Sequence, residues 1–411
     1  MPPLLDTTSR SWPPLRAAGL AERGGRHRVL RDPLEREVSP LELLFDLVFV
    51  LGVSQLTRHL ISGSTWSGVA ETFVLYVPVF AVWAYTSWAA TLYSLTHPPA
   101  RRMVVAVMVV SLFMNASLAR AFDDARWVFV VTFLTIQLGR TAWMLTTPLD
   151  PINREHFVAT LVWLAATAPV WIAGAAASRD VRLDLWAAAA AIDLTGIWLA
   201  HPLLRRRRRP QPVEFGGEHL IERCRLFLLI ALGETVATPG TALAAAPIRV
   251  QTVAAGTLAL AATLCLWWLY FHAEPRARQH VARAEDRVYA SRLGTNGLLF
   301  MIAGLIALAA GNALVIHHPS RGATLVIALM LCGGPGTFLL ARAWYQGRVF
   351  AAAPRAQLLA VGLLGLIVAG ARAGPALVCS VAVVAVLAGL VVIEYFNDLA
   401  ESDRRRRTRA P

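Results

Sequence analysis

Lysine is absent from this sequence, and charge of either sign is sparse. All 39 basic residues of the 411-residue chain are arginines, and charged residues make up only 16% of it. Soluble globular chains are nearer a quarter charged. Hydrophobic residues make up 56% of the chain, and its mean hydropathy is +0.53. This composition disfavours an ordinary soluble protein and favours one whose partner is the lipid bilayer.

Cysteines are few, and the motifs of soluble enzymes are missing. No two of the four cysteines form a CxxC motif, so we expect buried free thiols. The sequence has no P-loop, dinucleotide-binding fingerprint, zinc-protease motif or nucleophile elbow. We therefore expect no catalytic residues, no cofactor, no metal site and no enzyme activity.

Long apolar windows recur along the whole chain. Windows of roughly 20 residues suit transmembrane helices, whereas barrel strands would alternate in polarity over about 10 residues. The sequence therefore predicts an all-α, polytopic bundle of about 12 transmembrane helices. The windows are 41–61, 69–92, 103–122, 127–147, 157–177, 183–200, 219–238, 250–271, 288–316, 323–343, 356–372 and 376–396.

Arginine concentrates in alternate predicted loops. One set of loops, together with both termini, holds 27 arginines, and the other set holds eight. Because cytoplasmic loops collect basic residues, this bias predicts that both termini are cytoplasmic. The same bias accounts for the net charge of +13, so no nucleic-acid partner is expected.

Short motifs recur in the same order in the two halves of the chain. The matching stretches are 47–52 with 228–233, 83–85 with 268–270, and 115–116 with 312–313. Six helices per copy is an even number, so the sequence predicts two parallel six-helix repeats related by an axis along the membrane normal. The predicted parts are a disordered Arg-rich tail (1–38), the first repeat (39–201), a cytoplasmic linker (202–217), the second repeat (218–398) and a basic tail (399–411). The sequence also allows a homo-oligomer.

Two carboxylates open the first predicted helix. Glu42 and Asp46 are four residues apart and therefore share one helix face. Ser39 and Pro40 are typical of a helix start, because Ser caps the helix and Pro fits its first position. The carboxylates either cap the helix and form a structural ion pair, or bind a cation or proton.

Further charges lie in the seventh predicted helix. Glu222 and Arg225 can pair at i,i+3, whereas Glu234 lies deep in the helix and needs a partner, for which we consider Arg140. The candidate ion- or substrate-binding residues are Glu42, Asp46, Glu222 and Glu234, and the candidate charge partners are Arg140, Arg223 and Arg225.

Two further features concern the last helices. Glu394 lies close enough to the membrane interface to be hydrated. Pro335 and the glycine-rich stretch 333–336 allow two alternatives for the tenth predicted helix: a kink or break, as is typical of transport sites, or close packing against a neighbouring helix.

These residues resemble the bacterial low temperature requirement A family. The resemblance rests on stretches 39–50 and 219–234, with 267–271 similar to a third family block, and it covers roughly residues 37–398. It implies a polytopic protein of the bacterial plasma membrane, named from a growth defect in the cold, without an activity that can be transferred. Near residues 289–297 the family pattern contains a histidine, whereas this chain has Arg292 and Asn296. The third family block usually ends in Asp, and this chain has His272 there. Phe45-Asp46 is more faintly similar to potassium channels with paired six-helix repeats.

Three functions are compatible with these features. The first is a transporter or channel for a cation, proton or small solute, in which buried acids bind the cargo. The second is a membrane sensor or structural protein in cold or envelope adaptation, in which the same charges form static ion pairs. The third is a membrane-embedded enzyme acting on a lipid-linked substrate.

Overall fold

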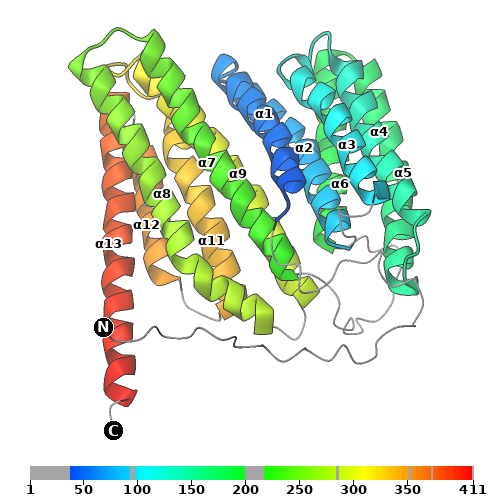
Figure 1. Cartoon of the computed structure of the whole chain (residues 1–411). Helices are drawn as coiled ribbons and strands as arrows, with labels where there is room; N and C mark the ends of the chain where they lie inside the picture. Colours follow the sequence, from blue (N-terminus) through cyan, green and yellow to red (C-terminus); the bar gives the residue numbers. More distant parts are fainter. Residues whose placement is uncertain are drawn as a thin grey trace, which may run out of the picture.

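The computed structural model describes residues 38–92, 98–199, 217–283, 287–350, 354–371 and 374–409. Within these ranges the chain forms helices and no strand, which confirms the predicted all-α fold (Figure 1). The helices are α1 (Pro40–Ser62), α2 (Trp66–Leu92), α3 (Pro98–Ser117), η2 (Leu118–Arg120), α4 (Arg126–Leu145), α5 (Pro151–Ala176), α6 (Arg179–Leu199), α7 (Gly217–Ala245), α8 (Val250–Arg283), α9 (Arg287–His317), α10 (Leu325–Ala328), η3 (Leu329–Gly333), α11 (Gly334–Phe350), α12 (Arg355–Gly370) and α13 (Ala376–Arg409).

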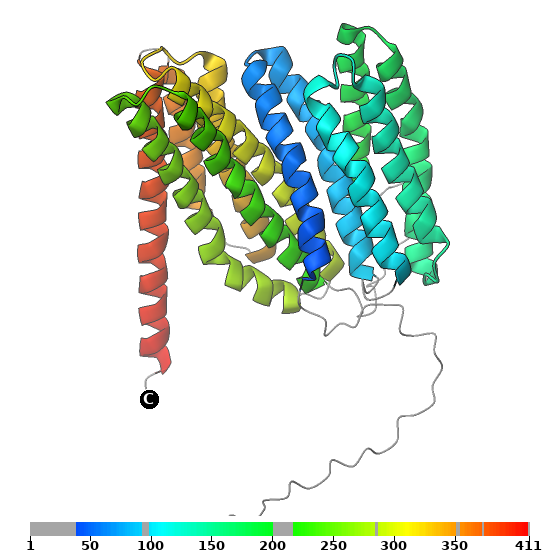
Figure 2. The same cartoon turned by 45° about the horizontal axis from the view of Figure 1, so that its top comes forward.

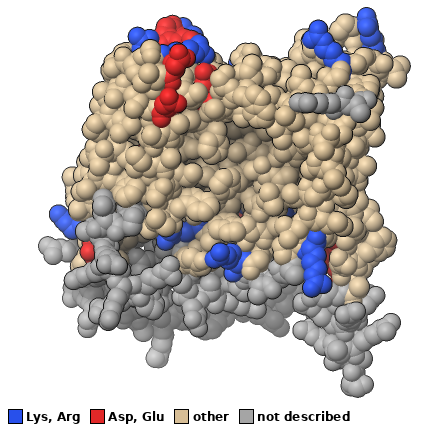
Figure 3. Space-filling model, turned by 180° about the vertical axis from the view of Figure 1, so that it is seen from behind, with Lys and Arg blue, Asp and Glu red and all other residues tan. Residues whose placement is uncertain are grey.

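Ten of the described helices are long and apolar enough to cross a membrane. Each predicted window falls on one helical rod when α10, η3 and α11 are counted as one. The two rods outside the ten are α12, which has only 16 residues, and α6, which carries several charges. Charged side chains gather at the two ends of the visible face, and an uncharged belt separates them (Figure 3). The protein is therefore a multi-pass membrane protein.

The structure describes only part of the predicted tails and linker. Apart from residues 38 and 217, the predicted tail 1–38 and linker 202–217 lie outside the described residues. The predicted basic tail is helical as far as it is described, because α13 continues to Arg409. The start of α1 and the end of α13 lie at the same end of the bundle, where α13 projects beyond its neighbours (Figure 1 and Figure 2).

Helix α1 begins where the sequence predicts. The Ser39 hydroxyl accepts a hydrogen bond from the backbone N–H of Glu42 (3.3 Å), and the Glu42 carboxylate accepts one from the N–H of Ser39 (2.8 Å). This reciprocal capping box satisfies two N–H groups that the helix itself leaves unpaired. It also orients the Glu42 side chain at the start of the helix.

Replacing Ser39 with alanine is expected to lower the free energy of unfolding by about 1 kcal/mol, because the cap of α1 is lost. Denaturant titration in mixed micelles would measure this change. Ser62→Ala is the control, since the exposed Ser62 hydroxyl only donates to the His59 carbonyl at the far end of α1. Equal stability of Ser39→Ala and the unmodified protein would contradict the prediction.

The neighbour relations within the first six helices recur among the last six. The contacts of α1 with α2 and α3, of α2 with α4 and α6, and along the series α3–α4–α5–α6 correspond to those of α7 with α8 and α9, of α8 with α11 and α13, and along α9–α11–α12–α13. The halves meet where α1 packs against α7 and α9, and α2 against the same two helices.

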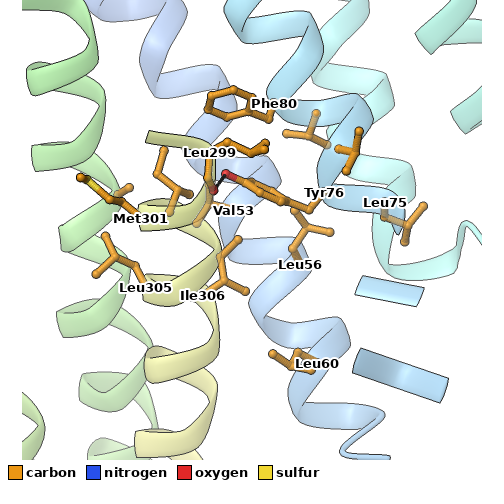
Figure 4. Close-up of a cluster of buried hydrophobic side chains, with 14 of the residues drawn as sticks. Val53, Leu56, Leu60, Leu75, Tyr76, Phe80, Leu299, Met301, Leu305 and Ile306 are labelled. Carbon is orange, nitrogen blue, oxygen red and sulfur yellow. Dashed lines mark hydrogen bonds between the residues drawn. The ribbon is translucent and has the colours of Figure 1, made fainter. Parts of the chain in front are cut away.

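A buried apolar cluster joins the halves at this junction. Side chains of α1, α2 and α9 interdigitate there, and the Tyr76 hydroxyl donates a hydrogen bond to the Leu299 carbonyl (2.6 Å; Figure 4). The hydrogen bond satisfies the one polar group that Tyr76 carries into the cluster. Packing of this kind fixes how α1 lies against the second half.

Of the two alternatives for the tenth span, a break or close packing, the structure matches close packing around a single π-helical turn. Pro335 lacks an N–H, and its ring crowds the carbonyl four residues earlier, so the chain widens by one residue over η3 and then resumes as α11. Here α9 and α11 approach most closely: a Cβ added to Gly304 would lie 2.4 Å from the Gly334 carbonyl oxygen. The glycines therefore permit close backbone contact without interrupting the rod.

The four cysteines are free thiols, as predicted. Three are buried, and Cys265 is half-buried. They are not all isolated, however, because the sulfur atoms of Cys332 in η3 and Cys379 in α13 lie 3.7 Å apart. The sequence offers no signal for this pair, since the two residues come from different helices.

Candidate functional site

Helices α1 and α7 are joined by two buried contacts between a basic and an acidic side chain. His219 Nε2 lies 2.8 Å from Glu42 Oε1, and Arg223 Nη2 lies 2.7 Å from Asp46 Oδ1. Glu42 and Asp46 are four residues apart on α1, and His219 and Arg223 are four residues apart on α7. Two helices that run in the same direction therefore present matching faces, and the pairs form successive rungs between them.

The side chains that form these two contacts are buried. The four side chains are at most 3% exposed. Trp83 of α2 donates its indole N–H to Asp46 Oδ1 (2.8 Å) and stacks on Phe227 at 4.4 Å between ring centroids. The Arg223 guanidinium lies 5.2 Å from the ring centroid of Phe45. Of the two alternatives for Glu42 and Asp46, this geometry matches helix capping and ion pairing.

Glu222 and Arg225 form the pair that their spacing predicts. Arg225 donates to Glu222 at 2.8 Å, and their side chains are 32% and 15% exposed. The Arg225 guanidinium also lies 5.5 Å from the ring centroid of Phe271. The pair is partly exposed and lines none of the cavity described below, so the structure does not bring Glu222 to that cavity.

Glu234 lies in the middle of α7 and has a different environment. It is 3% exposed, and its two carboxylate oxygens accept hydrogen bonds from the hydroxyls of Ser54 on α1 and Thr238 on α7. Among the described residues Glu234 forms no ion pair. Its charge is therefore held by neutral hydroxyl donors, which is an expensive arrangement within a bilayer.

The predicted partnership between Arg140 and Glu234 is wrong. The Arg140 guanidinium donates to Gln137 (2.6 Å) and Thr86 (3.1 Å) and lies 5.2 Å from the ring centroid of Tyr85. Because Arg140 projects from α4 toward α2, it stays within the first half of the bundle. Sequence spacing carries no information about which face of α4 meets α7.

Glu394 is 18% exposed, which fits its predicted place near the membrane interface, but it is not an isolated acid. Arg342 contacts both Glu394 carboxylate oxygens, at 2.6 and 2.7 Å, and Gln357 donates to the same carboxylate at 3.1 Å. Arg342 is only 4% exposed. This bidentate pair ties α11 to α13 within the second half.

A cavity of about 460 Å³ adjoins Glu234. It runs from Ser54 and Glu234 to Ala245 and His317, which are the last residues of α7 and α9, and so reaches the end of the bundle opposite the chain termini. Its walls come from α1, α7 and α9 and consist of Ser54, Arg58, Ile61, Glu234, Ala237, Thr238, Thr241, Ala242, Ala245, Ala313 and His317.

The other end of the α1–α7 interface is closed. Asp46 and Ser54 are eight residues apart on α1, which corresponds to about 12 Å of helix. Between them Phe49 and Val53 are at most 1% exposed, and Ala231 of α7 is fully buried. The cavity therefore stops at Glu234, and apolar packing followed by the ion pairs separates it from the end that carries the termini.

Four residues of the ion pairs and the cavity were not among the site residues predicted from the sequence. His219 could have been found, because its spacing from Arg223 matches that of Glu42 from Asp46. Thr238 follows Glu234 by one helical turn and was likewise accessible. Ser54 and Arg58 carried no signal, because nothing in the sequence shows that α1 lies against α7 at that height. Across the described ranges no three His, Cys, Asp or Glu side chains converge on a metal-sized site.

The comparisons with known proteins agree with this architecture. The family model described as bacterial low temperature requirement A protein matches residues 37–392. A Rhizobium meliloti (strain 1021) protein described as uncharacterized is 30% identical over 332 residues, which cover 79% of this chain and 80% of the relative. No solved structure matches the chain. The matched region contains every described transmembrane helix from α1 to most of α13, and the chain belongs to the bacterial low temperature requirement A family.

Proposed function

We propose that this protein is a transporter that receives a positively charged group of its solute at Glu234. The observation that carries the proposal is a buried carboxylate without an ion-pair partner among the described residues, facing a cavity that reaches one end of a membrane bundle. An intramembrane carboxylate of this kind is retained at a cost, and its charge is neutralised when a cation or proton binds.

The closed end of the interface favours a transporter over an open channel. A channel needs a continuous polar path, whereas packed apolar side chains and the Asp46–Arg223 and Glu42–His219 pairs separate the cavity from the opposite end. In this proposal the described arrangement is open toward one side of the membrane. The ion pairs at the junction of the halves would have to separate or move together for the solute to leave on the other side.

The same proposal includes the orientation and the origin of the two halves. The arginine bias supports a cytoplasmic location for both termini in a bacterial plasma membrane, so the Glu234 cavity would open to the outside. The recurring neighbour relations support parallel six-helix repeats. Movement of one half against the other about their junction would then expose Glu234 alternately.

Replacing Glu234 with glutamine is expected to lower solute flux at least tenfold, because the charge that receives the cationic group is lost. A charge-assisted hydrogen bond contributes about 1.5–3 kcal/mol, which corresponds to tenfold or more in affinity. The assay is uptake of protons, Na⁺, K⁺ and methylammonium into proteoliposomes that contain the purified protein. Glu155→Gln, which removes a carboxylate of α5 remote from the cavity, is the matched control.

Equal flux through the Glu234→Gln and Glu155→Gln variants would contradict the proposed role of Glu234. The buried ion pairs favour one alternative, a sensor or structural membrane protein in which these charges are static. Properly folded protein that moves neither these probes nor a small amino acid, and whose thermal midpoint none of them shifts, would favour that alternative.

A further inference from the structure

We infer that the solute is a small zwitterion that carries a primary ammonium group and a carboxylate. The inference rests on the proposed function of the Glu234 cavity and specifies its substrate class. Three features of the cavity carry it: an unpaired negative charge at its inner end, an unpaired positive charge nearer its mouth, and walls that lack an aromatic cage.

The inner end of the cavity suits an ammonium group with N–H donors. Ser54 and Thr238 donate their hydroxyl protons to Glu234, so the lone pairs of both hydroxyl oxygens remain able to accept. Together with the Glu234 carboxylate and the Thr241 hydroxyl, they offer acceptors from more than one direction. An ammonium group with three N–H donors can use several of these acceptors at once.

The walls disfavour other cations. Quaternary ammonium groups are bound by faces of Trp, Tyr and Phe, and none of these residues lines the cavity. A hard divalent cation such as Ca²⁺ takes six to eight oxygen ligands with several carboxylates, whereas Glu234 is the one carboxylate here. Among organic cations, one that carries N–H donors is therefore the class that fits these walls.

Arg58 supplies the complementary charge for a carboxylate. It lies four residues after Ser54 on α1, about 6 Å further along the helix axis and toward the mouth of the cavity. Among the described residues Arg58 forms no ion pair or hydrogen bond, and it does not contact Glu234. A solute that carries only positive charge would pass this guanidinium at a cost, whereas a zwitterion places its carboxylate there in a charge-assisted contact.

The order of charges sets the orientation of the bound solute. The ammonium group lies at the inner end against Glu234, and the carboxylate lies toward the mouth against Arg58. Arg58 lies about one helical turn beyond Ser54, which is the hydrogen-bond partner of Glu234 on α1. An amino acid whose charges are separated by a short spacer therefore fits better than a compact α-amino acid.

Binding of three matched probes to the purified protein tests the inference. The probes are 4-aminobutanoate, butylamine, which lacks the carboxylate, and butanoate, which lacks the ammonium group. We expect 4-aminobutanoate to bind at least tenfold more tightly than butylamine, and butanoate to show no measurable binding. Isothermal calorimetry in detergent gives the affinities, and the shift in thermal midpoint provides a second readout.

Two variants assign the charges. Arg58→Gln is expected to abolish the preference for 4-aminobutanoate while leaving the affinity for butylamine unchanged or higher. Glu234→Gln is expected to abolish binding of both amines. Arg249→Gln is the control, because this exposed arginine at the start of α8 lies at the same end of the bundle but does not line the cavity.

The possible results separate the inference from the proposed function. If butylamine binds as tightly as 4-aminobutanoate and Arg58→Gln changes neither affinity, the zwitterion is wrong but cation binding at Glu234 stands. If neither amine binds, the zwitterion is wrong, and the role of Glu234 is then decided by the flux of protons, Na⁺ and K⁺ described above. If Glu234→Gln changes neither that flux nor any affinity, both are wrong. Affinities for a series of amino acids with increasing spacers, from glycine to 6-aminohexanoate, test the separation of the two charges. Tightest binding of glycine would contradict the short spacer.

Discussion

Replacing Arg223 with methionine is expected to destabilise the protein by about 3–5 kcal/mol, because it leaves the Asp46 carboxylate buried without its cation. Asp46 is completely buried, and Trp83 would remain its one described hydrogen-bond donor. Denaturant titration in mixed micelles, followed by tryptophan fluorescence, would give the loss in free energy of unfolding. A value this large is a considerable part of the stability of a typical protein.

A double variant separates loss of the ion pair from loss of packing. Asp46→Leu combined with Arg223→Met removes both charges and fills similar space, so most of the lost stability should return. Arg225→Met is the control: its pair with Glu222 is partly exposed, and its removal should cost less than about 1 kcal/mol. A double variant as unstable as Arg223→Met alone would show that packing around Arg223, rather than its charge, accounts for the effect.

Replacing Gly304 with alanine is expected to destabilise the protein by about 1–3 kcal/mol, because the helices can accept the methyl group only by moving apart. The added Cβ would lie 2.4 Å from the Gly334 carbonyl oxygen and 3.2 Å from the Phe338 backbone nitrogen. Both are backbone atoms of α11, so no side-chain rotation relieves the clash. The same denaturant titration would detect the loss.

The Gly365→Ala variant, also within a helix, is not expected to lose stability. A Cβ on Gly365 in α12 meets nothing within 4 Å, and alanine stabilises helices relative to glycine by about 0.5–1 kcal/mol. The variant should therefore be unchanged or slightly more stable. If Gly304→Ala were as stable as Gly365→Ala, the close approach of α9 and α11 would not limit the packing of the second half.

Both large effects depend on residues whose importance is only partly visible in the sequence. The pairing of Glu222 with Arg225 followed from their spacing, because both lie on one helix and the α-helix repeats every 3.6 residues. Asp46 and Glu42 were identifiable as costly charges, although nothing in their spacing named Arg223 and His219 as partners. Those partners come from a helix that begins more than 150 residues later.

The prediction for Arg140 failed for the same reason. A buried arginine in one helix and a buried glutamate in another suggested an ion pair, but α4 turns Arg140 toward Thr86 and Gln137. Glu234 instead receives two hydroxyl groups. Rotation of a helix about its own axis is fixed by packing, and an all-round apolar helix has no hydrophobic stripe from which that rotation can be read.

The sequence by itself determined the class of the molecule: twelve apolar windows became helical rods, because each polar backbone group in lipid must be satisfied within its own segment. It also determined the start of α1 and the local pair on α7. Tertiary structure alone decided which charges meet, that the tenth rod continues through a π turn, and that Glu234 faces a cavity with Arg58. These outcomes depend on how helices distant in the chain approach and rotate against one another. The spacing of residues within one helix gives no information about such contacts.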